Sequence, residues 1–381
     1  MTAEARAGVS PAELSSLPAC TLTASQLGDL ELLLSGALAP LTGFMPVADA
    51  VAVADRWRLA DGTPFPVPIT LDVPASVLPT DAALDRILLS DPEGTPIAVL
   101  TVEERTALSD RAGMVRLAGP VSANRPPEHG PFRRLMLSPA TARAELGDGP
   151  VLAFATRGPL SSRQIGQIRH LAGQLKARVL ILPLVSGHAA VVGSPQALIR
   201  SVLAAMPSLP ADSLLVPVPL PAHAEAPASQ AGRARELAVT ARVAAAYGAT
   251  HLMADGTVPT ADLPTADLPT ADVPRADLPT ADADRMADLP TAGADLAASL
   301  TTADVLPAGP DLRACARIPI LPSGDWAYDR RAEVWRPHAL IEAGTEWEDL
   351  SADQLGDLLD AGSEIPHWAV PAAVARELRR V

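Results

Sequence analysis

The sequence predicts an α/β protein in which a β-rich N-terminal region precedes a parallel sheet flanked by helices. Short extended segments separated by Pro and Gly dominate residues 20–150, and buried-strand patterns alternate with helix patterns from Val151 onward. In addition, 48% of the 381 residues are hydrophobic, enough for a sizeable core. Strand–helix alternation is typical of a doubly wound parallel sheet, and a chain of this length usually forms more than one domain.

The N-terminal region begins with a helix and continues with extended segments. Residues 23–40 have apolar side chains at helical spacing after a Thr or Ser that can cap the helix. Residues 61–74 predict a turn and then an extended segment, because its prolines exclude a helix interior. Residues 86–104 predict a hairpin, since two apolar runs flank the turn sequence DPEG. We expect these elements to form one domain over residues 1–150.

Strand and helix patterns alternate regularly in the next part of the chain. We expect strands at 151–157, 178–185, 212–220 and 249–255, and helices at 161–175, 194–206 and 232–248. Gly248 is a usual C-cap residue for the last of these helices. Ligands of such sheets bind at the carboxyl ends of the strands, so the turn before the first helix is the expected ligand position. We expect this domain over residues 151–258.

A five-residue unit, PTADL, repeats over residues 259–282 and returns at 287–296. Proline at nearly every fifth position removes a backbone donor each time, and about five units complete little more than one coil of a solenoid. The favoured interpretation is a flexible, acidic, low-complexity insertion over 259–300. A small ordered β-solenoid of the pentapeptide-repeat type is the alternative.

The remaining residues, 301–381, are expected to form a small C-terminal subdomain. Its last part, 347–381, predicts a helix, a turn and a second helix. Ser351 is the expected N-cap of the first helix, Gly362 its end, and Pro371 lies in the first turn of the second helix.

Charge and cysteine content exclude several classes of function. The formal net charge is −14, without a basic stripe, so neither nucleic acid nor an anionic membrane is expected as a partner. The N-terminus lacks the apolar core of a signal peptide, and no apolar run reaches the roughly 18 residues of a membrane helix. Cys20 and Cys315 lie far apart without a CxxC pair, so no metal site is expected and a reducing, cytoplasmic location fits best.

Several stretches together resemble ATP sulfurylase, the sulfate adenylyltransferase family. They are LTGFM (41–45), WRLADGTPFPVPITLDV (57–73), DPEGTPIAVLTVEE (91–104) and the ending LLDAGSEIPHWAVPAAVARELRRV (358–381). The resemblance covers nearly the whole chain apart from its first residues and the repeat. It implies a PUA-like N-terminal domain, a Rossmann-like nucleotidyltransferase domain and a small C-terminal helical subdomain.

The resemblance also implies a reaction. The family joins sulfate to the α-phosphate of ATP, giving adenylyl sulfate and pyrophosphate, usually with Mg²⁺. Because sulfate is already an anion, no general base is needed; the protein has to hold two anions together and stabilise charge on the phosphates. ATP, sulfate and adenylyl sulfate are therefore the implied ligands, and ATP and Mg²⁺ are the implied cofactors if the activity survives. No other cofactor is expected.

The family's catalytic turn has the pattern Q-x-R-N-P-x-H-x-x-H and falls at residues 155–164. Arg157 and Pro159 are retained, whereas Ser161 and Gln164 stand where the family has its two histidines. A guanidinium suits a bidentate grip on sulfate, so Arg157 is the main candidate contact, while Ser161 is alternatively only a helix N-cap. The pocket candidates in this turn are Thr156, Arg157, Gly158, Pro159, Ser161 and Gln164.

Two further family motifs contribute candidates. Arg235 and Glu236 match the end of A-G-P-R-E, and His251 matches the histidine before the family's G-R-D-H loop. That loop has no counterpart here, since residues 254–262 are ADGTVPTAD. An ordinary solvated helix face and a core histidine are the alternative interpretations. No catalytic residue is assigned, because the HxxH and G-R-D-H motifs are missing.

Three functional hypotheses follow. The leading one is a sulfate adenylyltransferase homologue with impaired catalysis, a pseudoenzyme with a regulatory or ligand-binding role linked to sulfate assimilation. It would act as a homo-oligomer or as a partner of an active sulfurylase. The second is an active adenylyltransferase with a rebuilt pocket, using sulfate or another oxyanion. The third is an interaction protein that acts through the acidic repeat.

Overall fold

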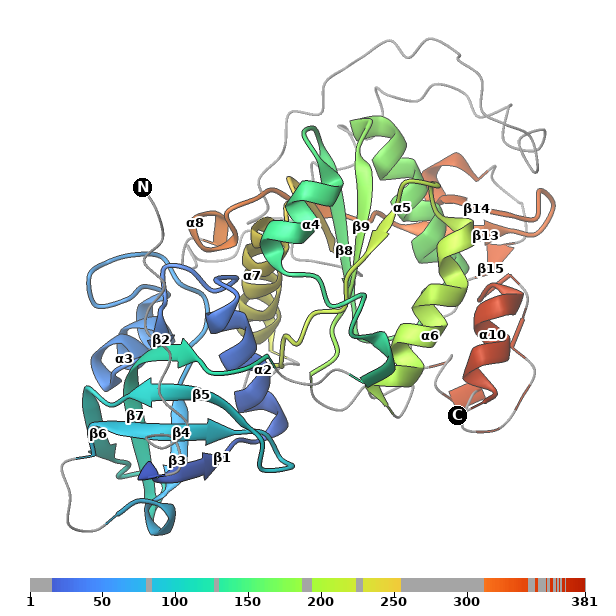
Figure 1. Cartoon of the computed structure of the whole chain (residues 1–381). Helices are drawn as coiled ribbons and strands as arrows, with labels where there is room; N and C mark the ends of the chain where they lie inside the picture. Colours follow the sequence, from blue (N-terminus) through green and yellow to red (C-terminus); the bar gives the residue numbers. More distant parts are fainter. Residues whose placement is uncertain are drawn as a thin grey trace.

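The computed structural model describes most of the chain. It covers residues 16–79, 84–126, 130–186, 194–223, 229–254 and 312–341, the positions 347, 348, 354, 357, 358, 361, 363, 365 and 366, and residues 368–380. The repeat at 259–296 lies outside these residues, so its character stays a prediction. The predicted α/β class is confirmed (Figure 1). No helix among the described residues is long and apolar enough to cross a membrane.

The N-terminal domain is built on a seven-stranded sheet of order β1-β4-β5-β7-β2, in which β3 and β6 also pair with β7. The long strand β7 (Met114–Ala123) is its centre and pairs antiparallel with four others. The remaining strands are β1 (Ala19–Thr21), β2 (Gly43–Phe44), β3 (Leu71–Pro74), β4 (Arg86–Ser90), β5 (Pro96–Thr101) and β6 (Glu104–Ala107). Helices α2 (Ala24–Leu34) and α3 (Val47–Arg56) complete this domain.

Local signals placed two elements of this domain correctly. The predicted hairpin is confirmed, because β4 and β5 pair antiparallel with Leu88 opposite Val99. The observed helix α2 is shorter than the predicted 23–40. It begins after Thr23, whose side chain forms a capping box with Gln26, and it ends before Gly36. Gly36 has φ 76, a left-handed conformation that favours glycine and ends the helix.

The second domain contains a five-stranded parallel sheet of order β10-β9-β8-β11-β12. Its strands are β8 (Val151–Thr156), β9 (Arg178–Pro183), β10 (Leu214–Leu215), β11 (His251–Ala254) and β12 (Ile320–Pro322). The strand order reverses between β8 and β11, and ligands of doubly wound sheets bind outside the carboxyl ends at such a switch point. The turn after Thr156 lies there.

The sheet differs from the sequence expectation in two places. Strand β10 has two residues instead of the expected 212–220, because Pro217 and Pro219 carry no N–H group for the ladder. The N–H groups of Val216 and Val218 still donate to β9, to the carbonyls of Ile181 and Pro183. The fifth strand, β12, comes from residues 320–322, so the sheet extends beyond the domain expected at 151–258.

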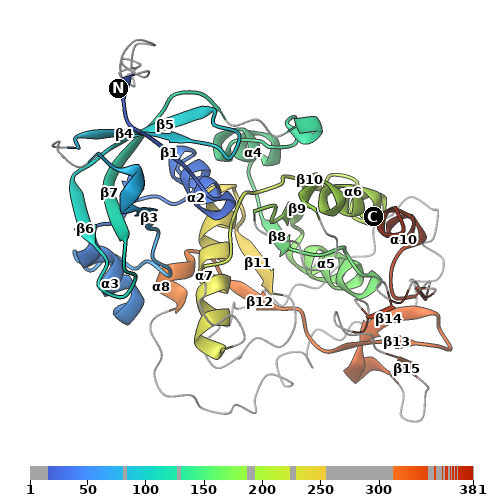
Figure 2. The ribbon, with the colours of Figure 1, turned by 90° about the horizontal axis from the view of Figure 1, so that it is seen from below.

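Helices cover both faces of the parallel sheet. Figures 1 and 2 show α5 (Ser162–Leu175) and α6 (Pro195–Ala205) on one face and α7 (Gln230–Ala246), with the short α8 (Leu312–Ala316), on the other. Alternation along β8 matches these layers: Leu152 and Phe154 pack in the core with α5 and α6, whereas Ala153 packs in the core that contains α7. Helix α4 (Pro139–Leu146) leads into β8.

The C-terminal residues form a small sheet and a helix. Antiparallel strands β13 (Trp326–Asp329), β14 (Val334–Pro337) and β15 (Trp347–Glu348) lie against α5, and α10 (Ala372–Leu378) packs on α6. Trp347 and Glu348 pair with β13, so the segment 347–381 begins with a strand before the expected N-cap. Gln354, Asp357 and Leu358 lie within the predicted first helix and are helical. The last helix is confirmed, with Pro371 as its N-cap. Ser351 and Gly362 lie outside the described residues.

Helix α7 joins the two large domains through a buried cation. The Arg242 side chain donates to the carbonyls of Ala39, Pro64 and Cys315, and its guanidinium lies 4.5 Å above the Phe65 ring. Burial, with a smaller contribution from Arg317, lowers the pKa of Arg242 to about 10. A cation satisfied by carbonyls and a ring fixes α7 against the N-terminal domain.

Candidate functional site

The turn after β8 closes on its own side chain. The Thr156 hydroxyl donates to the Gly158 carbonyl at 2.7 Å and accepts from the Gly158 N–H at 3.0 Å. A Cβ atom at Gly158 would meet no heavy atom within 4 Å, so the turn does not need glycine for space. Pro159 follows and has no N–H to offer. The polar groups of this turn are thus largely used within it.

Ser161 and Gln164 bond to each other at the start of α5. The Ser161 hydroxyl accepts from the Gln164 N–H at 3.1 Å, and the Gln164 side-chain oxygen accepts from the Ser161 N–H at 2.9 Å. This is a capping box, the arrangement that S-x-x-Q forms at a helix start. The Ser161 side chain therefore acts as the N-cap of α5, and the Gln164 side chain completes the cap.

The N-terminus of α5 is also covered from outside the turn. The Ser162 N–H donates to the carbonyl of Ala369, from the C-terminal segment, at 2.9 Å. A helix N-terminus attracts anions through its free N–H groups. Two of those groups, on Ser162 and Gln164, already have acceptors. An anion at this point would have to displace Ala369 or the cap.

Arg157 points toward carbonyls and a carboxylate at the same edge of the sheet. Its Nη1 donates to the carbonyls of Ser186 at 3.3 Å and Leu220 at 3.0 Å. Its Nη2 lies 3.8 Å from Glu236 Oε2 on α7 and, although buried, has no hydrogen-bond partner among the described residues. Burial lowers the pKa of Arg157, and Glu236 opposes that shift. One donor group of the guanidinium is therefore unsatisfied.

Two residues that sequence reasoning missed complete this cluster. His223 donates its backbone N–H to Glu236 at 2.5 Å, and its Nε2 lies 2.7 Å from Asp29 Oδ1 on α2. Burial alone would lower the pKa of His223, but Asp29 and Glu236 outweigh it and the pKa is raised, with Arg157 opposing. Asp29 was detectable as a charged residue inside the apolar run QLGDLELLL, whereas nothing local marks His223.

Arg235 and His251 lie elsewhere. Arg235 donates to the carbonyls of Val53, Ala54 and Pro66, and its guanidinium lies 4.5 Å above the Trp57 ring, at the junction of the two domains. His251 is the first residue of β11, opposite Leu152, and its Nδ1 lies 2.8 Å from the Thr250 hydroxyl. Four residues of strand, about 13 Å, separate that register position from Thr156. The structure does not bring these two side chains to Arg157.

The cluster offers little for holding Mg²⁺ and ATP. Within the described residues, no three His, Cys, Asp or Glu side chains are grouped so that they could hold a metal ion. The carboxylates of Asp29 and Glu236 already contact His223 and Arg157. The residues present therefore do not fit a magnesium–nucleotide site. They fit a single anionic group at Arg157 that displaces Glu236 from the guanidinium.

Comparisons with known proteins agree with the fold. A model of the PUA-like domain matches residues 1–117. Sulfate adenylyltransferase of Schizosaccharomyces pombe is 35% identical in an alignment 201 residues long, which covers 45% of this chain and 41% of that protein. That of Deinococcus radiodurans is 34% identical in an alignment 200 residues long, which covers 46% of this chain and 50% of that protein. The matches thus span half or less of these relatives.

A solved structure matches nearly the whole chain. The hexameric APS kinase from Thiobacillus denitrificans superposes with a TM-score of 0.73 at 26% identity, covering 97% of this chain and 64% of that one. The expected PUA-like N-terminal domain and α/β architecture are confirmed. With the identity to several sulfate adenylyltransferases over about 45% of the chain, these findings support an ATP sulfurylase-like family member.

Proposed function

We propose that this chain is a sulfate adenylyltransferase homologue with impaired catalysis and a regulatory or ligand-binding role linked to sulfate assimilation. The observation that carries the proposal is the capping box at α5. Ser161 and Gln164, which stand where the family has its histidines, bond to each other rather than facing a ligand as imidazoles would. Adenylyl transfer to sulfate depends on such donors to stabilise charge on the phosphates.

The expected loss of rate is large. Removing a single donor to a developing charge costs roughly 10²–10³ in turnover. Here two imidazoles are replaced, and Arg157 is bound to Glu236 and two carbonyls. Even without strict additivity we expect a rate about 10⁴-fold or more below that of an active family member.

Ligand binding is less affected than turnover. The unsatisfied Nη2 of Arg157 can donate to one oxygen of sulfate, of adenylyl sulfate or of a nucleotide phosphate. The ligand has to compete with Glu236 for the guanidinium, so we expect weak binding. The alternative, an active adenylyltransferase with a rebuilt pocket that uses ATP and Mg²⁺, is favoured only by this same unsatisfied group.

Assembly and location belong to the same proposal. The structural neighbour is described as hexameric, which supports a homo-oligomer here, and a complex with an active sulfurylase is the other possibility for a regulatory role. Cys20 and Cys315 are both buried and free, which supports a reducing, cytoplasmic setting. Sedimentation of the purified chain, alone and mixed with an active sulfurylase, distinguishes the two assemblies.

The reverse reaction tests the proposal directly. Purified protein is mixed with adenylyl sulfate, pyrophosphate and Mg²⁺, and ATP is read by luminescence beside an active sulfate adenylyltransferase. We expect no signal above the Arg157→Ala variant. ATP formation within about 10²-fold of the active enzyme, abolished by Arg157→Ala, contradicts impaired catalysis and supports the active alternative.

Binding needs a separate measurement. Calorimetry with adenylyl sulfate should give weak binding that Arg157→Ala abolishes and Glu236→Gln strengthens, because the latter releases the guanidinium. Arg163→Ala on the following helix is the matched control and should leave the affinity for adenylyl sulfate unchanged. Equal affinity of the wild type and Arg157→Ala contradicts a ligand role for this edge of the sheet.

A further inference from the structure

Several of the few aromatic residues of this chain lie together at the C-terminal sheet. Only 3% of the residues are aromatic, yet Trp326, Tyr328 and Trp335 form a buried cluster against which Trp368 packs. The cluster lies against α5 on the side remote from the N-terminal domain (Figure 2). None of these residues takes part in the cluster around Arg157.

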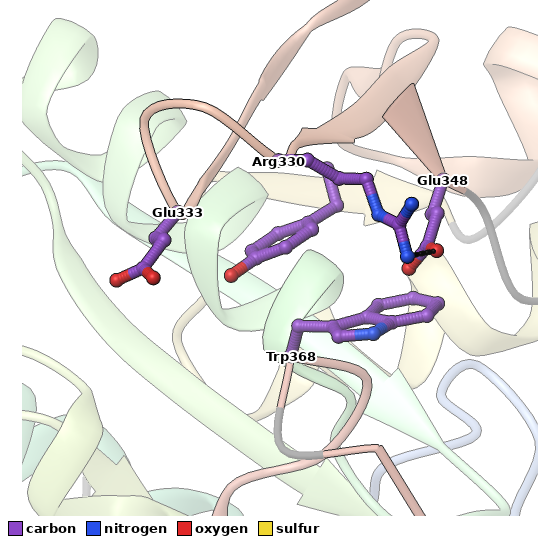
Figure 3. A pocket seen from close by; sticks show the side chains of 5 residues that line it. Arg330, Glu333, Glu348 and Trp368 are labelled. Atoms are coloured by element: carbon purple, nitrogen blue, oxygen red, sulfur yellow. Dashed lines mark ion pairs between the residues drawn. The ribbon is translucent and has the colours of Figure 1, made fainter. Parts of the chain in front are cut away.

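An open hollow lies at the edge of this cluster. Its volume is about 260 Å³, and its lining is shown in Figure 3: Tyr328, Arg330, Glu333, Glu348 and Trp368. Drug-sized ligands usually occupy cavities of about 300–1,000 Å³. The hollow is therefore large enough for one small head group or one side chain, and too small for a nucleotide.

The aromatic wall of the hollow is rigidly held. The rings of Tyr328 and Trp368 stack at 5.4 Å with 19° between their planes. The Trp335 indole N–H donates to the Trp368 carbonyl at 2.7 Å, which fixes the backbone that carries the second ring. Aromatic faces carry partial negative charge, so a rigid pair of rings is suited to a cation.

The charged groups of the lining favour a cation as well. Arg330 forms an ion pair with Glu348 at 2.5 Å, and Glu333 stands on the opposite side of the rings (Figure 3). Two carboxylates and one guanidinium leave the lining one negative charge in excess. In agreement, burial and then Glu333, Glu348 and Asp329 raise the pKa of the Tyr328 hydroxyl. Sulfate, nucleotides and other anions are disfavoured here.

We propose that this hollow binds a small organic monocation, namely an alkylated ammonium or a guanidinium group. The positive group lies against the Tyr328–Trp368 pair and between Glu333 and Glu348, while Arg330 competes for Glu348. The group is either a free small molecule or an arginine or methylated lysine side chain of a peptide. The proposal does not rest on the function of the Arg157 cluster.

Titration of the full-length protein tests the chemistry. Choline and methylguanidinium are added while the tryptophan indole N–H signals are followed by nuclear magnetic resonance. We expect saturable shifts at Trp335 and Trp368 with dissociation constants of about 1–10 mM, as for other small fragments. The matched ligand control is 3,3-dimethylbutan-1-ol, a neutral compound with the shape of choline. Equal binding of the alcohol, or no saturable shift with either cation, overturns the proposal.

Two substitutions make predictions of opposite sign. Glu333→Gln should weaken choline binding about two- to fivefold, because it removes one exposed carboxylate from the lining. Arg330→Gln should strengthen it by a similar factor, because it removes the competing cation and releases Glu348. Both positions are exposed, so unfolding midpoints should stay close to the wild type. Affinities that are unchanged, or changed in the same direction, overturn the proposal.

A blocked Gly-Arg-Gly tripeptide distinguishes the two sources of the cation. Affinity at least tenfold above that of methylguanidinium supports a side chain presented by a protein, since neighbouring backbone then contributes. Equal affinity supports a free small molecule. Arg330→Gln should strengthen the binding of whichever ligand is preferred, and failure to do so counts against the hollow as the binding site.

Discussion

The imidazole Nε2 of His223 lies 2.7 Å from Oδ1 of Asp29. This contact joins the segment that follows β10 in the second domain to helix α2 in the first. The two side chains are only 6% and 10% exposed. Through Glu236, which accepts from the His223 N–H and pairs with Arg157, the same contact reaches the candidate anion-binding arginine. The contact between the two domains and the ion pair of Arg157 with Glu236 are therefore physically linked.

The His223–Asp29 contact should make stability depend on pH. The groups facing His223 are Asp29, Glu236 and Arg157, and their sum raises its pKa above the unfolded value of 6.5. A raised pKa in the folded state stabilises fully below about pH 6.5, and this contribution is lost as the pH rises through the folded pKa. We expect the free energy of unfolding in urea to fall between pH 6 and pH 9.

The Asp29→Asn variant isolates this contribution. It keeps the shape of the side chain but removes the charge, so it should cost about 3 kcal/mol at pH 6, where the partner histidine is protonated, and clearly less at pH 9. The measured quantity is the difference between wild-type and variant unfolding free energies at each pH. Parallel profiles for the two proteins would show that His223 does not titrate with folding.

Local patterns account for the parts of the fold that local interactions decide. The strand β8, the helices α5 and α7, and the hairpin of β4 and β5 were all predictable, because each has its own periodicity and turn or cap residues. The strand β15 was not. Its two residues are extended only because they pair with Tyr328 and Asp329, and no signal within 347–381 reports that pairing.

The candidate site divides in the same way. The S-x-x-Q pattern at Ser161 already permitted an N-cap, so half of that outcome was visible in the sequence. The covering of Ser162 by Ala369 and the contact of Asp29 with His223, 194 positions apart, depend on how distant segments fold together. Matching residues to a family motif singled out Arg157 at the carboxyl end of β8, but it could not show which groups contact the guanidinium.

The capping box should have a measurable effect on stability. Ser161→Ala removes the hydroxyl that accepts from the Gln164 N–H, and we expect a loss of about 1 kcal/mol. Gln164→Ala should cost a similar amount, and the double variant less than the sum, because the two groups act together. Ser162→Ala, one position along, is the control and should stay within about 0.5 kcal/mol. Strict additivity in urea unfolding would contradict a reciprocal box.

The buried guanidinium of Arg242 should be far more important than the charge alone suggests. Arg242→Ala removes donors from the carbonyls of Ala39 and Cys315 and leaves a cavity beside Phe65, so we expect a loss of about 3 kcal/mol. Arg242→Lys keeps the charge but cannot reach several carbonyls at once, and should cost nearly as much. Arg233→Ala, on the exposed side of the same helix, is the control. A harmless lysine substitution would show that charge, not geometry, matters there.

Two glycine-to-alanine substitutions in helices should change stability in opposite directions. A Cβ atom at Gly28 in α2 would lie 2.4 Å from the Pro219 carbonyl oxygen and 2.7 Å from the Ser186 hydroxyl, across the domain boundary. Although alanine favours a helix, this overlap should cost about 2 kcal/mol net and also weaken anion binding, since Ser186 and Leu220 hold Arg157. Gly173→Ala in α5 meets nothing within 4 Å and should stabilise by about 0.5–1 kcal/mol. Urea unfolding measures both values; if Gly28→Ala also stabilised the protein, the two domains would not be in contact at α2 as described.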